Sequence, residues 1–244
     1  MKMGRRATIA FLLLAPIFLL GARCIDHESL RKGPDGDWHL YGEIHNDTNV
    51  QGTQILLQGT LFDPSGRVVG VGQTYICPGD LSPGTFSVYD IRIKDSSAIV
   101  GPVARQVNVL SGKAVPEHLP PLPVTDINFT TTATRAADGS VSWEIDFHYS
   151  PPTDGPVSSG PVYGCAAFYD ASGNVVSVER PDTPDVGQYH ISGFSELKRD
   201  MDPTVPADAV SFRGLFWFPS SDSAQFESNF APVISDLIAI PAEP

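Results

Sequence analysis

The chain has 244 residues, enough for one large domain or two small ones at roughly 100 to 200 residues each. Its composition, 41% hydrophobic and 18% charged with 22 Gly and 22 Pro, is typical of a turn-rich globular chain and excludes a helical bundle or a disordered polymer. The formal charge of −12 disfavours nucleic acid and anionic lipid surfaces as partners. We expect this charge to serve solubility, and an acidic binding face is the alternative.

Residues 1–24 predict a secretory signal peptide or a membrane anchor. Basic residues precede an uncharged apolar run of sixteen residues at 7–22, which is the pattern of a signal. A spanning helix needs about 20 apolar residues, and Pro16 interrupts the run, so we favour cleavage or lipidation over a retained anchor. Removal of this segment takes away four basic residues and no acidic one, so the formal charge would change from −12 to −16. The basic residues are Lys2, Arg5, Arg6 and Arg23.

Cys24 is a candidate lipidation site. Residues 20–24 (LGARC) resemble a bacterial lipobox, in which a leucine stands three residues before the cysteine and a small residue directly before it; here Gly21 and Arg23 hold those positions. The alternative is ordinary cleavage after Ala22 or after Cys24, because these two small residues fit the A-x-A pattern. Residues 25–37 show no periodicity and contain a Gly-Pro-Asp-Gly cluster, so they predict a polar tether.

Beyond residue 37 the pattern predicts strands. Residues 38–45 alternate between apolar and polar side chains, the period of a half-buried strand. Residues 55–62 and 67–74 predict two more strands, joined as a hairpin by the tight turn from Asp63 to Gly66. Further strands are expected near 86–93 and 104–110. Residues 113–123 contain four prolines and predict a linker between two domains, 38–112 and 124–244.

The second half of the chain repeats this pattern. Residues 141–149 alternate like the strand at 38–45, with His148 in register with His45. Residues 168–176 repeat 61–69, so that Asp170 and Gly173 match Asp63 and Gly66; in each turn the aspartate caps the backbone and the glycine takes a positive φ. Residues 212–218 should match the strand at 86–93, after an insertion at 187–200 with room for one helical turn. We infer an internal duplication from this repeat, and the duplication predicts an all-β fold of two tandem sandwich modules.

Three segments of the first copy carry a family resemblance: residues 41–46 (YGEIHN), 60–70 (TLFDPSGRVVG) and 81–86 (LSPGTF). Together they resemble the FxLYD family of bacterial and archaeal exported β-sandwich modules over most of residues 38–110. The second copy keeps only the D-x-S-G hairpin. The resemblance implies immunoglobulin-like antiparallel sandwiches of about seven strands and no enzymatic activity.

Metal and catalytic sites are not predicted. Glu43 with His45, and Asp146 with His148, would each lie on one face of a strand, but no third or fourth ligand is apparent, so we expect solvated outward faces. The turns at Asp63 and Asp170 offer one carboxylate each, too few for calcium. Because the sequence contains no G-x-S-x-G, H-E-x-x-H, P-loop or G-x-G-x-x-G motif, we predict neither a catalytic residue nor a cofactor.

Two cysteines, Cys77 and Cys165, follow the N-terminal segment. A disulfide between them would bridge the two modules. The alternative, which we favour because Ala166 and Ala167 also predict burial, is a pair of small buried thiols, one in each module. The apolar run at 215–218 predicts a core strand that is buried on both faces.

These features together predict a non-catalytic protein that is exported and held at the cell envelope or surface, with membrane contact only through its N-terminal segment. It would serve as a binding or spacer module for an unknown protein or envelope partner. The alternatives are an exported enzyme or enzyme subunit whose site is built from loops, and a structural component of an envelope complex.

Overall fold

The protein consists of strands and turns throughout the part that is described. The structure, a computed structural model, describes residues 25–96, 99, 104–115, 125–150, 163–180, 187–189, 194–202, 204–217 and 231–242. No helix in these ranges is long and apolar enough to cross a membrane. The predicted signal or anchor at 1–24, with Cys24, lies outside the described residues, as does most of the predicted linker; its first three residues, 113–115, belong to a strand.

The first module is a sandwich of two antiparallel sheets. One sheet has the order β1 (Ile25–Lys32), β2 (Trp38–His45), β5 (Phe86–Ile93), and the other has the order β4 (Val68–Tyr75), β3 (Gln51–Phe62), β6 (Arg105–Val115). Alternate side chains of β2, such as Leu40 and Ile44, are fully buried between the sheets, as the period-2 pattern predicts. Ile55, Leu57 and Leu61 of β3 meet them there.

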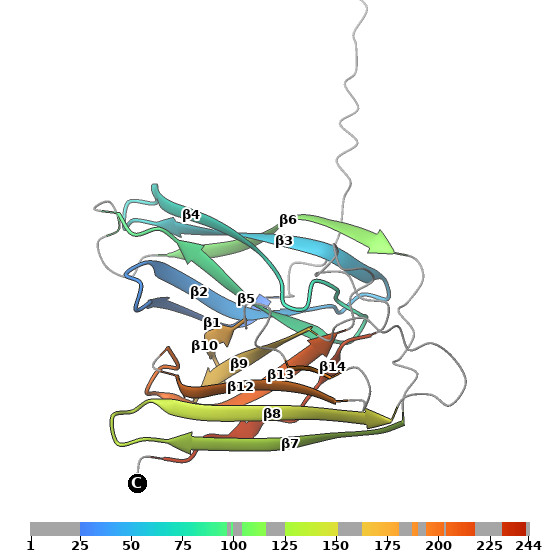
Figure 1. Ribbon diagram of the computed structural model, residues 1–244. Coiled ribbons are helices and arrows are strands. Elements are labelled where there is room, and N and C mark those ends of the chain that lie inside the picture. The colour runs from blue at the N-terminus through green and yellow to red at the C-terminus, as the bar shows by residue number, and fades with distance from the viewer. Residues whose placement is uncertain are drawn as a thin grey trace, which may run out of the picture.

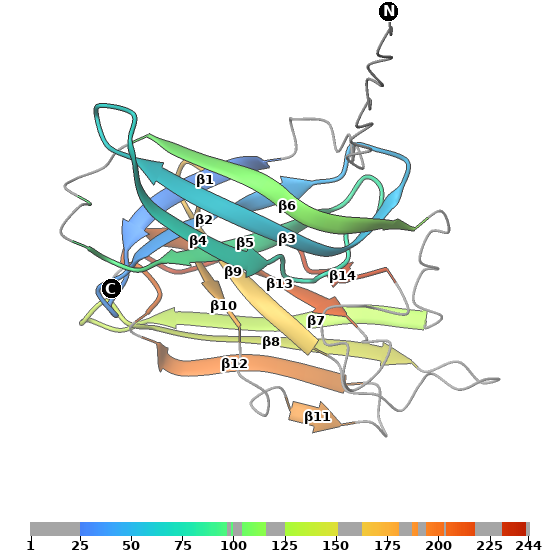
Figure 2. The same ribbon diagram turned by 90° about the horizontal axis from the view of Figure 1, so that it is seen from above.

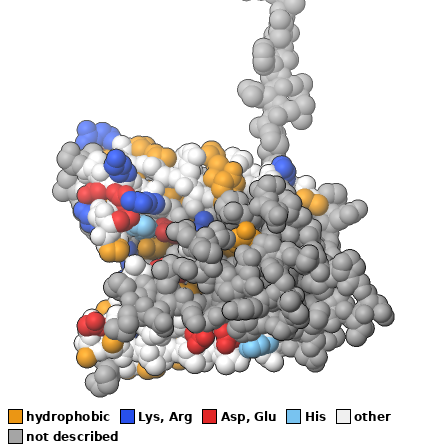
Figure 3. Space-filling model, in the orientation of Figure 1, with side chains coloured by type: hydrophobic (Ala, Val, Ile, Leu, Met, Phe, Trp, Pro, Cys, Tyr) orange, Lys and Arg blue, Asp and Glu red, His pale blue; other side chains and the backbone are white. Residues whose placement is uncertain are grey.

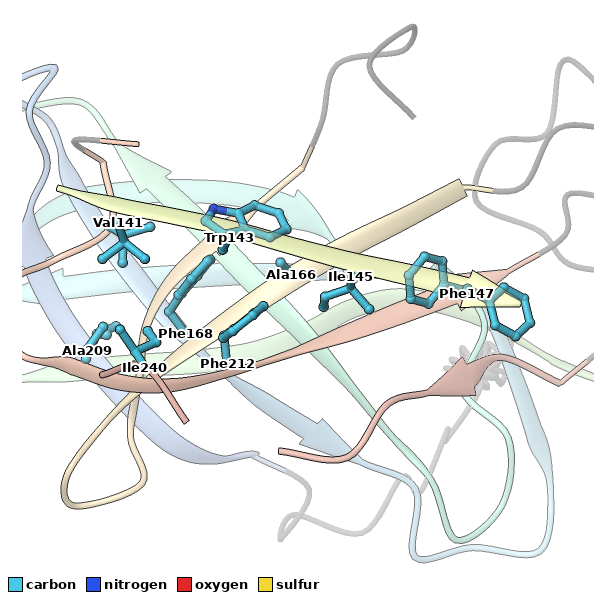
Figure 4. Close-up of a cluster of buried hydrophobic side chains, with 12 residues drawn as sticks. Val141, Trp143, Ile145, Phe147, Ala166, Phe168, Ala209, Phe212 and Ile240 are labelled. Atoms are coloured by element: carbon cyan, nitrogen blue, oxygen red, sulfur yellow. The ribbon is translucent and has the colours of Figure 1, made fainter. Parts of the chain in front are cut away.

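The second module is also a two-sheet sandwich. One sheet has the order β11 (Gly187–Tyr189), β12 (Phe194–Asp202), β8 (Val141–Ser150), β7 (Thr125–Arg135). The other has the order β10 (Val175–Glu179), β9 (Tyr163–Asp170), β13 (Ala209–Trp217), β14 (Val233–Ile234), and β15 (Ile238–Ala239) also pairs with β13. The core is aromatic: Figure 4 shows Trp143, on β8, close to Phe168 and Phe212 from the facing sheet. The predicted all-β sandwich fold is therefore confirmed.

Both modules follow one strand order, which supports the duplication. β2 lies between β1 and β5 as β8 lies between β7 and β12, and β3 lies between β4 and β6 as β9 lies between β10 and β13. His45 pairs with Phe86, and His148 occupies the same position opposite Phe194. The counterpart of β5 is thus β12, and the expected match between β5 and residues 212–218 is wrong. β12 was missed because Phe194, Leu197 and Met201 do not alternate strictly.

Residues 25–37 are not a tether, because β1 occupies Ile25–Lys32 and pairs with β2. The pairing register shifts between Asp26 and Ser29, where β1 carries one extra residue. This bulge lets Ile25 and Leu30 both pack on the core although they are five residues apart. Strict alternation would have placed them on opposite faces, so the bulge hid the strand from the sequence pattern.

The four sheets stack as four layers (Figure 1), with the β1-β2-β5 sheet of the first module facing the β10-β9-β13-β14 sheet of the second. Seen from above, the outer strands β3, β4 and β6 cross obliquely over the second module (Figure 2). The sandwiches have separate cores, and a third cluster of buried side chains lies between them. They are therefore packed against each other rather than strung on a linker.

The two Asp-x-Ser-Gly turns have the predicted conformation. Gly66 and Gly173 adopt φ values of 79° and 83°, and each donates its N–H to the carbonyl of the aspartate three residues earlier, Asp63 or Asp170. In each turn the aspartate Oδ1 accepts the N–H groups two and four residues later. The aspartates are thus occupied in holding the turns.

Candidate functional site

The face of β2 that points away from its own core is covered by the second module. Tyr41 and Glu43 on this face are 8% and 4% exposed. The expectation that Glu43 lies on a solvated face is therefore wrong, because alternation marks two faces of a strand but does not reveal that a second sandwich covers one of them. We call the buried set between the modules the interface cluster. It comprises Tyr41, Cys77, Val88, Cys165, Ala167, Tyr169, Val175, Val178, Leu215 and Trp217.

A disulfide between Cys77 and Cys165 links the modules inside this cluster, with Cα atoms 6.5 Å apart and 88 residues of separation along the chain. Both cysteines are buried, but the favoured alternative of two reduced thiols is wrong. The physical reason is that each cysteine faces the partner module, so the two side chains meet. Burial on both faces of the run at 215–217 is confirmed, since Phe216 enters the second core and Leu215 and Trp217 enter the interface cluster.

Polar contacts surround the apolar interface. Arg31 of β1 makes two hydrogen bonds, of 2.8 and 2.7 Å, to the carboxylate of Asp208, and this pairing lowers the pKa of Asp208. The Ser29 hydroxyl donates to the Val175 carbonyl. An apolar centre with a polar rim is the usual organisation of a specific protein interface.

A pocket of about 570 Å³ opens at the edge of this interface. We call it the seam pocket. Both modules line it, the first with His27, Glu43 and His45 and the second with Tyr169, Gly173 and Arg213, among others. Pockets between two domains are common positions for ligands.

The carboxylate of Glu43 is the centre of the polar groups in the seam pocket. Its Oε1 accepts a hydrogen bond of 2.8 Å from the Tyr169 hydroxyl of the second module. Its Oε2 lies 2.9 Å from Nε2 of His45 and 4.0 Å from Nε2 of His27. Burial, followed by the charge of Glu43, raises the pKa of Tyr169, so this hydroxyl remains a donor. The pair Glu43 and His45 thus has a third member, His27, that the sequence pattern did not indicate.

His27 reaches this group because of the bulge in β1. It has a φ of 52°, in the left-handed region that non-glycine residues seldom adopt. Bulges often redirect a side chain, and backbone strain of this kind is found at functional sites. The turn glycine Gly173 lies beside it, since a Cβ built on Gly173 would be 3.7 Å from the His27 Nδ1.

Arg213 forms another side of the seam pocket. Its guanidinium lies over two rings, 5.1 Å from the centroid of Phe86 and 5.2 Å from that of Tyr169. Cation–π contacts hold it in place between the two modules. The pocket therefore combines two imidazoles, one nearly buried carboxylate and one fixed cation.

Among the residues that the structure describes, the duplicated positions in the second module do not form such a group. Asp146 and His148 correspond to Glu43 and His45, and both are half-buried on the face of β8 opposite the aromatic core. Within the described ranges, His27, Glu43 and His45 are the single set of three ligating side chains that lie close enough to share a metal ion.

Another charged cluster lies at the β1–β2 hairpin end of the first module, where Figure 3 shows acidic and basic side chains intermixed. His39 lies between Asp90, 2.8 Å from its Nδ1, and Asp35, 3.2 Å from its Nε2. The hydrogen bond to Asp90 is the main factor that raises the pKa of His39. Arg92 pairs with Asp37 at 2.7 Å. The hydrogen bonds and ion pairs named here join residues of the first module, and His39 stacks on Tyr41 of the interface cluster, with 5.6 Å between the ring centroids.

Comparisons with protein families and with curated sequences give no match. No protein-family model matches the chain, and no curated protein matches it in sequence. The resemblance to the FxLYD family therefore stays a prediction from the quoted motifs.

Proposed function

We propose that this protein is an exported, non-catalytic binding or spacer module that is held at the cell envelope. The observation that carries the proposal is the disulfide between Cys77 and Cys165 within the interface cluster. Structural disulfides form and persist in oxidising compartments outside the cytoplasm. The signal-like pattern of residues 1–24 supports the same location.

The packing of the modules supports a role as one rigid body. Independent domains on a flexible linker move relative to each other, whereas an apolar interface with a covalent link opposes that motion. A spacer needs such rigidity, and a binding protein gains affinity when its site is preformed. The seam pocket is where we place the ligand, because both modules contribute fixed polar groups to it.

The position of β1 sets how the protein would sit at a membrane. β1 begins at Ile25 and is part of the first sandwich, so lipidation at Cys24 would attach the lipid directly beside a folded strand. The module would then lie against the bilayer surface instead of above it on a leash.

Export and disulfide formation can be tested together on the full chain expressed without a tag in a bacterial host. Cell fractionation, intact mass and alkylation of free thiols are measured on wild type and on Cys24→Ser. We expect residues 77 and 165 to resist alkylation without reductant, and the protein to occur in the envelope fraction. Cytoplasmic protein with both thiols free would overturn the proposal.

Cys24→Ser separates the routes of attachment. If Cys24 is lipidated, the wild type carries acyl mass and the variant is not processed at this residue. If ordinary cleavage occurs, both proteins lose the segment and are soluble, which would contradict retention at the envelope. A chain that keeps residues 1–24 in the membrane fraction, whether or not Cys24 is changed, would indicate an anchor.

A further inference from the structure

We infer that the seam pocket binds a divalent transition metal ion of the zinc class through Nε2 of His27, Oε2 of Glu43 and Nε2 of His45. The inference rests on the part of the proposed function that places a ligand in the seam pocket, and its test does not depend on export or on a partner protein. Imidazole nitrogen and carboxylate oxygen are common ligands of Zn²⁺, whereas Ca²⁺ and Mg²⁺ prefer oxygen ligands alone.

The spacing of the three ligand atoms suits one ion. They all lie within 4.8 Å of one another, with Oε2 of Glu43 at 2.9 Å from His45 and 4.0 Å from His27. Zinc–ligand bonds of about 2.0 to 2.2 Å place the ligand atoms of a tetrahedral site roughly 3.3 to 3.6 Å apart. The two distances from Glu43 lie on either side of that range, and the side chains of His27 and His45 are 42% and 34% exposed, so rotations of the two imidazole rings would bring the ligand atoms to this spacing.

The three residues come from two neighbouring strands, whose pairing fixes their backbone positions. Glu43 and His45 are two residues apart on β2 and share a face, as period-2 geometry requires. His27 is brought to that face by the bulge of β1, at a strained φ of 52°.

Tyr169 supplies the outer support that metal-binding carboxylates usually have. Its hydroxyl occupies Oε1 of Glu43 and leaves Oε2 directed at the two histidines. Hydrogen bonds of this kind orient a ligand and raise metal affinity. Since Tyr169 belongs to the second module, the docking of the two sandwiches brings this donor to Glu43 and orients its carboxylate.

Three protein ligands leave at least one coordination position, and it faces the seam pocket. Arg213, fixed over Phe86 and Tyr169, lines the same space. A small anionic ligand atom or water would complete the coordination there.

The inference is tested with tag-free, oxidised full-length protein by calorimetric titration with ZnCl₂ and by competition with a chromogenic chelator. We expect one equivalent of Zn²⁺ per chain. Co²⁺ in its place should give the intense visible absorption of a four- or five-coordinate ion. His27→Asn, Glu43→Gln and His45→Ala should each lower the affinity for Zn²⁺ at least 100-fold, and Tyr169→Phe should lower it about 10- to 100-fold.

His148→Ala is the matched control, because His148 occupies the duplicated position of His45. It should bind Zn²⁺ as the wild type does. Thermal unfolding without metal verifies that each variant is folded, and His27→Asn is chosen because asparagine tolerates a positive φ. Absence of a one-to-one site in the wild type, or equal losses in His148→Ala and His45→Ala, would overturn the inference and leave Glu43 and His45 as a hydrogen-bonded pair.

Discussion

Tyr169 and Glu43 lie on different modules, 126 residues apart, and are joined by a hydrogen bond of 2.8 Å from the phenol to the carboxylate. Both side chains are nearly buried, with 3% and 4% of the residue exposed. The docking of the two sandwiches therefore provides the hydrogen-bond donor for the carboxylate of Glu43.

Tyr169→Phe should destabilise the protein by about 1 to 3 kcal/mol, because one oxygen of a buried carboxylate would lose its donor. Urea unfolding followed by tryptophan fluorescence measures the change. Tyr163→Phe, on the same strand and stacked on Trp217, is the control and should change stability by less than about 0.5 kcal/mol. Equal effects of both substitutions would mean that the hydrogen bond between Tyr169 and Glu43 does not contribute to the free energy of unfolding.

Removal of the disulfide by Cys77→Ala with Cys165→Ala should lower the free energy of unfolding by about 2 to 4 kcal/mol. The link closes a loop with a sequence separation of 88 residues, and restraint of so long a loop reduces the entropy of the unfolded chain. Guanidinium unfolding of wild type with and without reductant gives the independent measurement. A reduced wild type as stable as the oxidised protein would contradict this expectation.

Gly66→Val and Gly173→Val should each destabilise by about 1 to 3 kcal/mol, since a β-branched residue is strained at φ near 80°. The two differ in their surroundings: nothing lies within 4 Å of a Cβ at Gly66, whereas His27 is the neighbour at Gly173. We therefore expect Gly173→Val to weaken Zn²⁺ binding as well, with Gly66→Val as the control of equal backbone strain. Denaturant midpoints of both variants measure the loss of stability, and chelator competition measures their affinity for Zn²⁺.

The charged cluster around His39 predicts a pH dependence of stability. Its pKa in the folded protein is raised by the hydrogen bond to Asp90, above an unfolded value of about 6.5. The stabilisation is fully present below the unfolded pKa and is lost as the pH rises through the folded pKa. The difference in unfolding free energy between wild type and His39→Gln should thus be larger at pH 6 than at pH 9, and a difference that grows with pH would refute the assignment.

A fragment of residues 124–244 should fold cooperatively on its own aromatic core, but it should be less stable than the whole and prone to associate. Its β9 and β13 strands carry Ala167, Leu215 and Trp217, which belong to the interface cluster and would lose the contacts with the first module that help to bury them. Circular dichroism melting, binding of a hydrophobic dye and sedimentation test this. A fragment without a cooperative transition would show that the second sandwich requires the first in order to fold.

The sequence predicted those parts of the fold that depend on local pattern. Alternation located β2 and β8, and the Asp-x-Ser-Gly turns were placed correctly because the aspartate and the positive-φ glycine determine the turn locally. β1 escaped prediction because its bulge breaks the alternation, and the same bulge carries His27.

The candidate site could be predicted only in part. Glu43 and His45 were placed on one face of a strand, but whether that face meets solvent depends on how two sandwiches dock, which is a long-range property of the surfaces. The bond between Cys77 and Cys165 depends on the same docking, so it remained one of two alternatives in the sequence. Tyr169 carried no signal at all, because a tyrosine in an apolar strand is ordinary core composition.

The disulfide also limits how far the protein can be stretched. Under a pulling force applied at its two ends, the residues between Cys77 and Cys165 cannot unravel, because tension passes through the sulfur atoms and bypasses them. With a sequence separation of 88 residues and at most about 3.3 to 3.6 Å for each, about 300 Å of chain is withheld from extension. The segment that carries β5, β6, β7 and β8 would therefore stay looped between the two sulfur atoms under loads that extend the chain on either side of it.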